Sequence, residues 1–345
     1  MKFEHELIGD YRAQFVEESG RLWVSKGYDV YYTDNFGESF LRRARLDVGS
    51  VKGVLSRWDL VNRFLRAGFL NVRPLLDGSL LGVVYGGIVR CEAGGDSFMP
   101  VLQRPGRTMK IVAHPDGRIF AGEYFYNKRR GPVDVLRSDD NGRTWQIVHQ
   151  FGPGEIRHIH SMMFDKRTGS LIILTGDTDR ESKILSTSDQ FKSLSVLSAG
   201  KQRSRALTIL PANDGYFLAT DTPFEQNYIQ FLSFSGELRL LCPIAGSCMS
   251  ACQVGDWSFF GTAAEPSPVN RDPSVTLYGT RDGQEWHVIQ RWHADRWSWP
   301  TGLQAAAFQM GRVLMPAGLN TTGYLFATPI AVKNVDGVLH RWKLA

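Results

Sequence analysis

A pair of histidines two positions apart, His158 and His160, is the pattern in this sequence with the clearest capacity for chemistry. Residues i and i+2 of a β-strand point to one face, so both imidazoles would lie on the same side of a strand. Such a pair can hold a divalent metal if a carboxylate such as Glu123 or Asp177 supplies a third ligand. It can also bind substrate or act as a general base, or be satisfied by neighbouring loop carbonyls. The spacing leaves these interpretations open.

Carboxylates form the second candidate group. The segment from Thr175 to Glu181 contains three of them, Asp177, Asp179 and Glu181, between two apolar runs. Acidic clusters of this kind often mark a solvated turn. Glycoside hydrolysis, however, needs one carboxyl group as acid and a second as base or nucleophile. We therefore take Glu123 with Asp177 or Asp179 as the preferred catalytic pair, with His158 and His160 positioning the substrate or a metal.

Basic and aromatic residues lie in the segments around these groups. The guanidinium of arginine holds carboxylates through a bidentate fork, and exposed indoles stack on sugar faces, whereas buried ones only fill space. The residues predicted to bind substrate are Tyr124, Arg157, Glu181, Arg203, Arg205, Asp221, Trp297 and Trp299.

A recurring turn indicates the elements that position these residues. In the octet Ser138 to Trp145, short polar side chains can bond to their own backbone, Gly142 can supply a positive φ, and Trp145 begins the returning strand. Partial copies recur at intervals of about 50 residues, the length of a four-stranded propeller blade. The copies run from Thr33 to Phe40, Cys91 to Phe98, Thr187 to Leu194 and Thr280 to Trp286.

Short β-rich runs fill the intervals between the turns. Units of four such runs begin near Tyr11, Asn71, Met109, Ile156, Ala206, Met249 and Gln304. This pattern predicts an all-β fold, a seven-bladed β-propeller forming a single domain over 1–345. One short helical insertion is expected at about 55–68, where the apolar spacing is helical. A pair of β-sandwiches with Asp/Gly-rich turns is the alternative.

Composition restricts the partners. The net charge of +5 and the pI of about 9.0 favour an anionic ligand such as an acidic sugar. No long basic run supports nucleic-acid binding, and no apolar window is long enough to span a membrane. The N-terminal residues lack the apolar segment of a signal peptide, so we expect a cytoplasmic location. The four cysteines have no CxxC pairing and are expected to be small buried thiols.

The octet Ser-x-Asp-x-Gly-x-Thr-Trp at Ser138–Trp145 resembles the Asp-box of the neuraminidase (BNR) repeat, and with the blade pattern the chain resembles the sialidase-like propeller superfamily. That resemblance implies a carbohydrate-linked role. It also implies that the turns themselves lie on the outer rim and report the fold, not the chemistry. Sialidases hold a carboxylate with three arginines, the first usually in an Arg-Ile-Pro motif. This chain has Val72-Arg73-Pro74 instead, and Arg205 or Arg296 would have to supply the others.

A second resemblance is to propeller-type polysaccharide lyases such as the oligogalacturonate lyases, which combine a His-x-His metal cluster with an arginine that abstracts a sugar-ring proton. His158 and His160 would match the metal cluster, with Arg203 or Arg205 nearby. The resemblance also implies a further histidine and a glutamine as ligands, for which His293 and Gln304 are the candidates.

Three functions follow, in order of preference. The first is a glycoside hydrolase of sialidase-like fold that cleaves a charged or deoxy-sugar-containing glycan with carboxylate acid/base chemistry and needs no cofactor. The second is a lyase dependent on a divalent metal held by His158 and His160. The third is a non-catalytic propeller that serves as a binding or assembly platform. Under the first two, the expected partner is an anionic oligosaccharide or polysaccharide whose acidic groups the arginines would hold.

Overall fold

The computed structural model describes residues 3–49, 59–104 and 106–344. Its contacts divide the chain into two compact units. The first unit comprises the described residues of Met1–Gly68, Pro223–Gln230 and Leu240–Ala345. The second comprises Phe69–Thr222 and Phe231–Arg239 and carries most of the candidate site residues.

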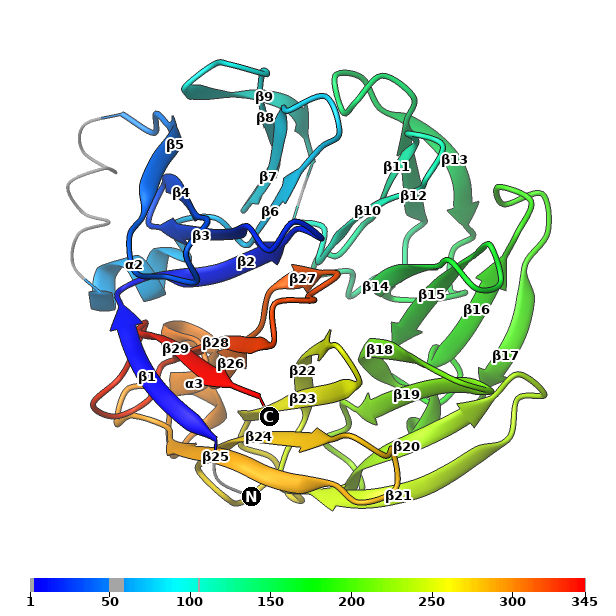
Figure 1. Cartoon of the computed structure of the whole chain (residues 1–345). Helices are drawn as coiled ribbons and strands as arrows, with labels where there is room; N and C mark the ends of the chain where they lie inside the picture. The colour runs from blue at the N-terminus through cyan, green and yellow to red at the C-terminus, as the bar shows by residue number, and fades with distance from the viewer. Residues whose placement is uncertain (1–2, 50–58, 105, 345) are drawn as a thin grey trace. The chain divides into compact units, whose positions relative to one another are not determined.

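The second unit consists of strands that pair antiparallel with their neighbours in sequence (Figure 1). The first group is β6 (Asn71–Pro74), β7 (Leu80–Val84), β8 (Gly87–Cys91) and β9 (Ser97–Gln103). The next is β10 (Ile111–Ala113), β11 (Ile119–Gly122), β12 (Val133–Ser138) and β13 (Gln146–Phe151). It is followed by β14 (His158–Asp165), β15 (Ser170–Gly176), β16 (Lys183–Thr187) and β17 (Ser195–Ala199).

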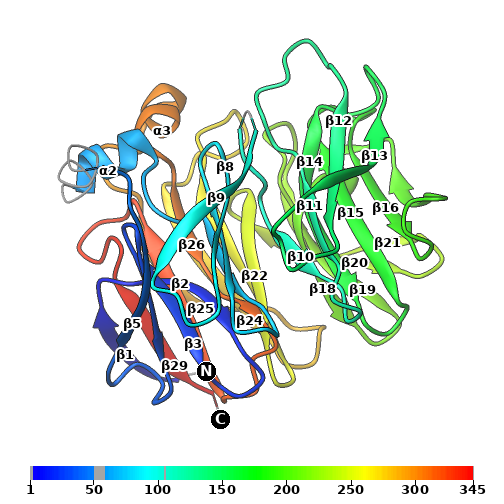
Figure 2. The same ribbon diagram turned by 90° about the horizontal axis from the view of Figure 1, so that it is seen from above.

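The remaining elements of this unit begin with the 3-10 helix η1 (Gln202–Ser204), followed by the paired strands β18 (Ala206–Ala212) and β19 (Gly215–Thr220). Strands β20 (Asn227–Ser233) and β21 (Leu238–Ile244) cross the boundaries of the units. The β15 sequence SLIILTG is buried throughout, as expected for a strand covered on both faces. Figure 2 shows the strands of this unit from above.

The first unit contains three further sets of strands. One is β2 (Arg12–Val16), β3 (Leu22–Lys26), β4 (Asp29–Thr33) and β5 (Leu41–Leu46), with the short β27 (Ala317–Gly318) parallel to β2. Another is β22 (Cys248–Val254), β23 (Trp257–Ala264), β24 (Ser274–Thr280) and β25 (His287–His293). The last is β26 (Gly311–Leu314), β28 (Tyr324–Ile330), β29 (Leu339–Lys343) and β1 (Glu4–Gly9).

The last set joins the two ends of the chain. Strand β1 pairs antiparallel with β29, with Glu4 opposite Lys343 and Leu7 opposite His340 (Figure 1). Four runs were expected to follow one another from Gln304, but the outermost strand comes from the N-terminus, and Gln304 itself lies in a helix. Sequence proximity could not reveal this pairing because β1 and β29 are at opposite ends of the chain.

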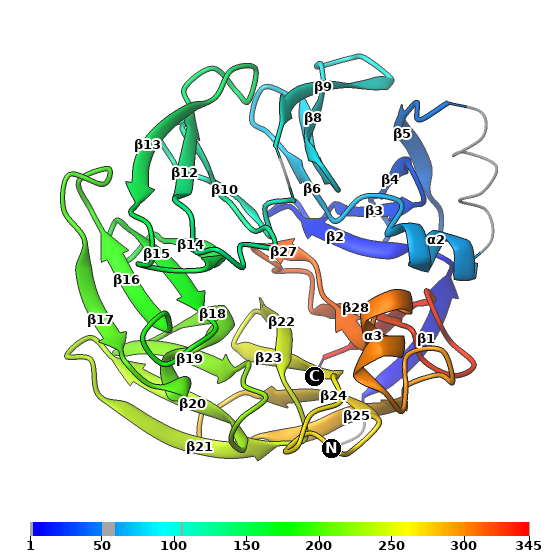
Figure 3. The same ribbon diagram turned by 180° about the vertical axis from the view of Figure 1, so that it is seen from behind.

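Two short helices lie side by side in the first unit (Figure 3). Helix α2 (Asp59–Leu65) falls within the expected insertion, of which residues 55–58 lie outside the described part. Helix α3 (Gly302–Phe308) was not predicted; Thr301 and Gln304 form a capping box at its start. The Arg63 side chain of α2 pairs with Asp295 and donates to Phe308 O at 2.9 Å. Neither helix is long and apolar enough to cross a membrane, and the described residues contain no other that is.

The recurring turns share one hydrogen-bond pattern. In the Ser138 turn, the serine hydroxyl accepts from Gly142 N and donates to Asp140, both at 2.8 Å, and Asp140 accepts from Thr144 N at 2.9 Å. The turns that begin at Thr33, Thr187 and Thr280 repeat these contacts with the hydroxyl of the threonine. Each connects the third and fourth strand of its set. The all-β prediction is therefore confirmed.

Three of the four cysteines match the expectation of small buried thiols. Cys91, Cys248 and Cys252 are buried, whereas the thiol of Cys242 is partly exposed. Such thiols act as small apolar side chains.

Candidate functional site

The antiparallel pairing of β14 with β15 brings the best candidates together. His158 begins β14 and lies opposite Gly176, the last residue of β15, so Asp177 follows directly beside the histidines. The register shifts between Ile159 and Ser161, which places His160 at a β-bulge. A bulge re-aims side chains. The two imidazole rings here have centroids 5.1 Å apart and face the same carboxylate.

Backbone carbonyls orient both imidazoles. His158 Nδ1 lies 3.1 Å from Phe125 O, and His160 Nδ1 lies 3.1 Å from Ala206 O. A carbonyl oxygen only accepts hydrogen bonds, so both Nδ1 atoms must carry the proton. In the neutral ring, Nε2 then presents a lone pair. Both Nε2 atoms face Asp177 Oδ1, at 3.6 Å from His158 and 3.3 Å from His160.

Asp177 is the anionic centre of this group. Its Oδ2 accepts from Arg157 Nη1 at 2.6 Å, and Arg205 Nη2 lies 3.3 Å from Oδ1. Burial raises the pKa of the Asp177 carboxyl, but its interactions with His158 and His160 outweigh burial and hold the pKa well below its usual range. The carboxylate is therefore ionised at neutral pH and is a weak base.

The arrangement fits a divalent cation. Burial lowers the pKa of His160, against the raising effect of the nearby Asp177 carboxylate, so the ring is neutral at pH 7 with its proton on Nδ1. Two Nε2 lone pairs and a carboxylate oxygen then face one another, and His158 Nε2 is buried without a hydrogen-bond partner. Nitrogen and oxygen ligands about 2.1 Å from a tetrahedral ion lie about 3.4 Å apart, close to the observed separations. Among the described residues, these three form the cluster of His, Cys, Asp or Glu that could hold a metal.

Side chains that the sequence did not single out support the Asp177 loop. Gln202, at the start of η1, donates to Asp177 O at 3.1 Å and to Asp179 Oδ1 at 2.8 Å, and its Oε1 accepts from Thr222. Gly176 has a packing role, because a Cβ there would lie 2.3 Å from His160 Cε1. The sequence could have pointed to Gly176, because this glycine directly precedes the acidic run. It could not have pointed to Gln202, because no pattern in the sequence marks a glutamine before a strand.

The other predicted residues of the acidic loop have structural partners. Asp179 is exposed and accepts the hydrogen bond from Gln202. Glu181 is buried, forms an ion pair with Arg130, and accepts from Thr178 N at 3.1 Å. Glu181 therefore closes its own loop and ties it to the loop that contains Arg130.

Of the predicted substrate-binding residues, Tyr124 and Arg205 lie at the histidines. The Tyr124 ring packs against His158 with centroids 4.0 Å apart and the ring planes tilted by 30°. The Arg107 guanidinium lies over the Tyr124 ring, 5.1 Å from its centroid. Arg205 also lies 3.5 Å from the buried Asp221. Arg203 is exposed on η1.

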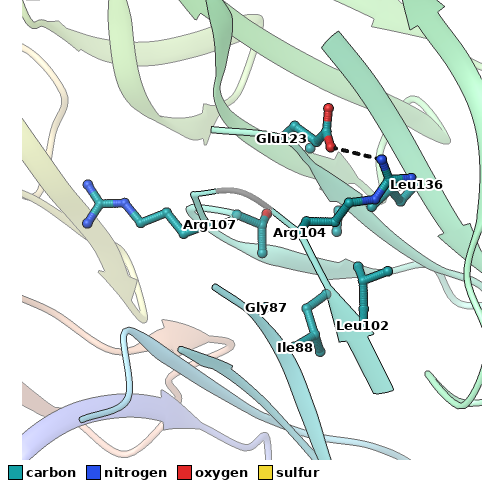
Figure 4. Close-up of a pocket in the computed structure, with 10 residues that line it drawn as sticks. Gly87, Ile88, Leu102, Arg104, Arg107, Glu123 and Leu136 are labelled. Atoms are coloured by element: carbon teal, nitrogen blue, oxygen red, sulfur yellow. Dashed lines mark ion pairs between the residues drawn. The ribbon is translucent and has the colours of Figure 1, made fainter. Parts of the chain in front are cut away.

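Glu123 has different surroundings from those of its neighbour Tyr124. Its carboxylate accepts from Asp134 N at 2.9 Å and lies 3.5 Å from Arg104 Nη1 (Figure 4). Figure 4 shows this ion pair in a pocket with Ile88, Leu102 and Leu136. Burial raises the pKa of the Glu123 carboxyl, against the lowering effect of the hydrogen bond from Asp134 N. The glutamate thus belongs to a separate polar group beside the centre formed by the histidines and Asp177.

The remaining candidates belong to the first unit. Trp297 is about one-third exposed, packs near Phe308 and has the Arg296 guanidinium 4.9 Å from its ring centroid. Trp299 is partly buried against an apolar core. His293 is exposed at the end of β25, and Gln304 caps α3.

Comparisons with known proteins show similarity of fold. No family model matches the sequence, and no curated protein matches it. The chain is similar to a solved chain of the mitotic checkpoint complex, with a TM-score of 0.58, 8% identity, and coverage of 100% of this chain and 94% of that one. It is also similar to YCF48 bound to D1 peptide, with a TM-score of 0.57, 11% identity, and coverage of 100% and 98%.

A third similar structure is an oligogalacturonate lyase in complex with manganese, with a TM-score of 0.56, 12% identity, and coverage of 99% of this chain and 90% of that one. These neighbours have propeller-type folds. At such low identity, the likeness concerns the fold alone, and the chain is an all-β protein whose structural neighbours are propellers.

Proposed function

We propose that the second unit binds a divalent cation at His158, His160 and Asp177 and uses this centre to bind and cleave an acidic oligosaccharide. The observation that carries the proposal is the buried His158 Nε2, which has no hydrogen-bond partner and faces a carboxylate oxygen 3.6 Å away. Because a carbonyl fixes the proton on Nδ1, a cation would satisfy Nε2 without changing the orientation of the ring. The manganese complex of a structural neighbour supports the same choice of ion.

Arginines beside the centre suit an acidic sugar. Arg157 and Arg205 both contact Asp177, and the Arg157 Nε atom is buried without a partner. Arg205 lies between Asp177 and Asp221, 3.3 Å from one carboxylate and 3.5 Å from the other. We assign the two arginines to the binding of carboxylates along the acidic sugar chain, an interaction that their planar forks favour.

Elimination suits this centre better than hydrolysis. A bound cation would polarise the sugar carboxylate and acidify the proton on the adjacent ring carbon. In the elimination, a base takes that proton, the carbon–hydrogen electron pair becomes a double bond, and the glycosidic oxygen leaves with its bonding pair and is protonated. Hydrolysis by Glu123 and Asp177 would need a free Asp177 oxygen as base or nucleophile, but Oδ2 accepts from Arg157 and Oδ1 lies 3.3 Å from Arg205.

Titration with Mn²⁺ followed by calorimetry tests the cation centre. Wild-type protein should bind one ion per chain, whereas His158→Ala and His160→Ala should bind about one to two orders of magnitude more weakly or not at all. His287→Ala, which alters an exposed histidine of β25, is the matched control and should bind normally. Equal binding by all four proteins would refute the cation centre.

Product analysis with oligogalacturonate separates the reactions. Elimination yields new reducing ends together with an unsaturated product that absorbs in the near ultraviolet, whereas hydrolysis yields reducing ends alone. Reducing ends without absorbance would overturn the elimination in favour of hydrolysis. Cation and sugar binding without either product would leave a binding platform as the function.

We further propose that the strand sets are blades of one seven-bladed propeller with Asp-box turns that forms a single domain. The recurring hydroxyl–aspartate turns and the full-length similarity to propeller-type structures support this. A compact single domain of this length has a radius of gyration of about 20 Å. Solution scattering that gives a clearly larger value would contradict the single domain.

A further inference from the structure

The loop that follows Tyr124 is fixed to the candidate cation centre on both sides of one exposed aromatic residue. Phe125 O accepts from His158 Nδ1, and Asn127 Nδ2 donates to Arg157 O at 3.0 Å. Tyr126 lies between these two anchors and is 78% exposed. The residues on either side of Tyr126 are therefore held by hydrogen bonds to His158, which belongs to the centre, and to Arg157, which directly precedes it.

Further contacts stabilise the same loop. The buried Asn127 side chain accepts from Gly131 N at 2.8 Å and donates to Gly131 O at 2.9 Å. Arg130 forms an ion pair with the buried Glu181 of the acidic loop. Because both ends of the loop are fixed, the exposure of Tyr126 does not result from a loose surface turn.

Arg157 links Tyr126 to the centre. Its guanidinium carbon lies 5.5 Å from the centroid of the Tyr126 ring, while its Nη1 donates to Asp177 Oδ2 at 2.6 Å. Its Nε is buried without a partner. One guanidinium thus lies between the candidate cation ligands and an exposed aromatic ring, and it retains an unused donor.

We propose that Tyr126 and Arg157 form a second sugar subsite, next to the sugar held at the cation centre, for a uronic acid residue of the same oligosaccharide. This inference rests on the proposed function and adds to it the residues that hold a second sugar of the chain. The Tyr126 ring stacks against the C–H face of the second sugar, and Arg157 binds its carboxylate. The exposed cations Lys128 and Arg129 on the same loop attract the acidic chain.

A second interpretation gives Tyr126 only the task of covering Arg157 through a cation–π contact. Such contacts at exposed sites contribute about 0.5–1 kcal/mol, and this role would affect all ligands of the centre equally. A subsite instead affects only ligands long enough to reach it. Chain length is therefore the variable that separates the two.

The experiment measures binding of galacturonate, digalacturonate and trigalacturonate by calorimetry in the presence of Mn²⁺. Proteins compared are wild type, Tyr126→Ala, Tyr126→Phe and Tyr85→Ala. Tyr85, 62% exposed between β7 and β8 of the same unit, provides the matched loss of an exposed tyrosine. Binding of Mn²⁺ alone to each protein is measured separately.

We expect Tyr126→Ala to weaken binding of the di- and trisaccharide by about 2- to 12-fold, the equivalent of one aromatic contact, and to leave galacturonate and Mn²⁺ binding unchanged. Tyr126→Phe should retain the affinity because the ring, and not the hydroxyl group, makes the contact. Tyr85→Ala should match wild type at every length.

The outcomes separate this inference from the function on which it rests. Suppose that wild type binds Mn²⁺ and the oligosaccharides. If Tyr126→Ala then loses no affinity for the oligosaccharides, or loses affinity for galacturonate to the same degree, the subsite is refuted and the cation centre stands. If Mn²⁺ binds but no length of sugar does, the subsite is again refuted. If Mn²⁺ fails to bind to wild type, the proposed function itself fails.

Discussion

Replacement of Gly176 by alanine tests whether the close packing around His160 sets the geometry of the candidate cation centre. A Cβ at this position would lie 2.3 Å from His160 Cε1, 3.0 Å from His160 Nε2 and 3.1 Å from Arg205 Cγ. Ordinary contact begins near 3.4 Å, so the imidazole must withdraw by about 1 Å. The ring is buried and bonded through Nδ1 to Ala206 O, which leaves it little freedom to do so.

We expect Gly176→Ala to lower both the folding stability and the affinity for Mn²⁺. Overpacking of this kind costs about 1–3 kcal/mol of folding free energy. Metal sites tolerate ligand displacements of only about 0.2 Å, so a shift several times larger should lower Mn²⁺ affinity by at least about tenfold. The affinity loss should exceed what the loss of stability would suggest, because the inserted methyl group acts on a candidate ligand.

Thermal unfolding with and without Mn²⁺ measures both effects. In wild type, Mn²⁺ at a concentration of about 100 times its dissociation constant should add about 2.7 kcal/mol to the free energy of unfolding. Gly176→Ala should lose most of that increment. Gly152→Ala is the control, because a Cβ there meets only Glu155 Oε2, at 3.5 Å. A Gly176→Ala protein with wild-type stability and Mn²⁺ affinity would refute the packing argument.

Three further predictions concern groups outside the centre. Burial, with a smaller contribution from His5, lowers the pKa of His340 to about 4, so the unfolded chain binds the proton first and stability falls as pH falls from about 6.5 towards 4. The contribution of His340 to this loss between pH 7 and pH 5 is about 2 kcal/mol, so urea unfolding should show a loss smaller by about that amount in His340→Phe than in wild type. Glu123→Gln should leave Mn²⁺ binding unchanged in calorimetry, since Arg104 and Asp134 hold this carboxylate; weaker binding would place Glu123 among the ligands. Asp140→Ala removes acceptors for Ser138 and Thr144, and denaturant unfolding should reveal a loss of about 1–3 kcal/mol with normal Mn²⁺ affinity.

Local patterns predicted the strands well because a few adjacent residues determine each turn. A hydroxyl, an aspartate two positions later and a glycine or its substitute are enough to close the turn at Ser138, and the same contacts recur at Thr187 with Phe191 in place of the glycine. Pairing between distant segments has no such local signal. The β1–β29 pair and the contact of α2 with the chain near Phe308 both join residues more than 200 positions apart.

The sequence predicted the candidate site only in part, because local spacing is visible in the sequence and the pairing of strands is not. The His158 and His160 spacing indicated a shared face, and the two rings do meet at one carboxylate, although a bulge at His160 contributes to this arrangement. The sequence offered Glu123 or Asp177 as the carboxylate partner of the histidines. Only the register, with His158 opposite Gly176, shows that Asp177 is the one beside the imidazoles.

Alternation along the chain explains why Glu123 and Tyr124 have separate surroundings. Successive residues of an extended segment point to opposite sides, so when the Tyr124 ring packs against His158, the Glu123 side chain enters the pocket with Arg104. Opposite electrostatic environments follow, because burial raises the pKa of Glu123, whereas histidines and arginines keep Asp177 ionised. Two carboxylates of this kind could serve as an acid and an anionic ligand. The cation centre at Asp177 is favoured instead by position, because both imidazole Nε2 atoms face Asp177 Oδ1, whereas Arg104 and Asp134 hold Glu123 in a separate pocket.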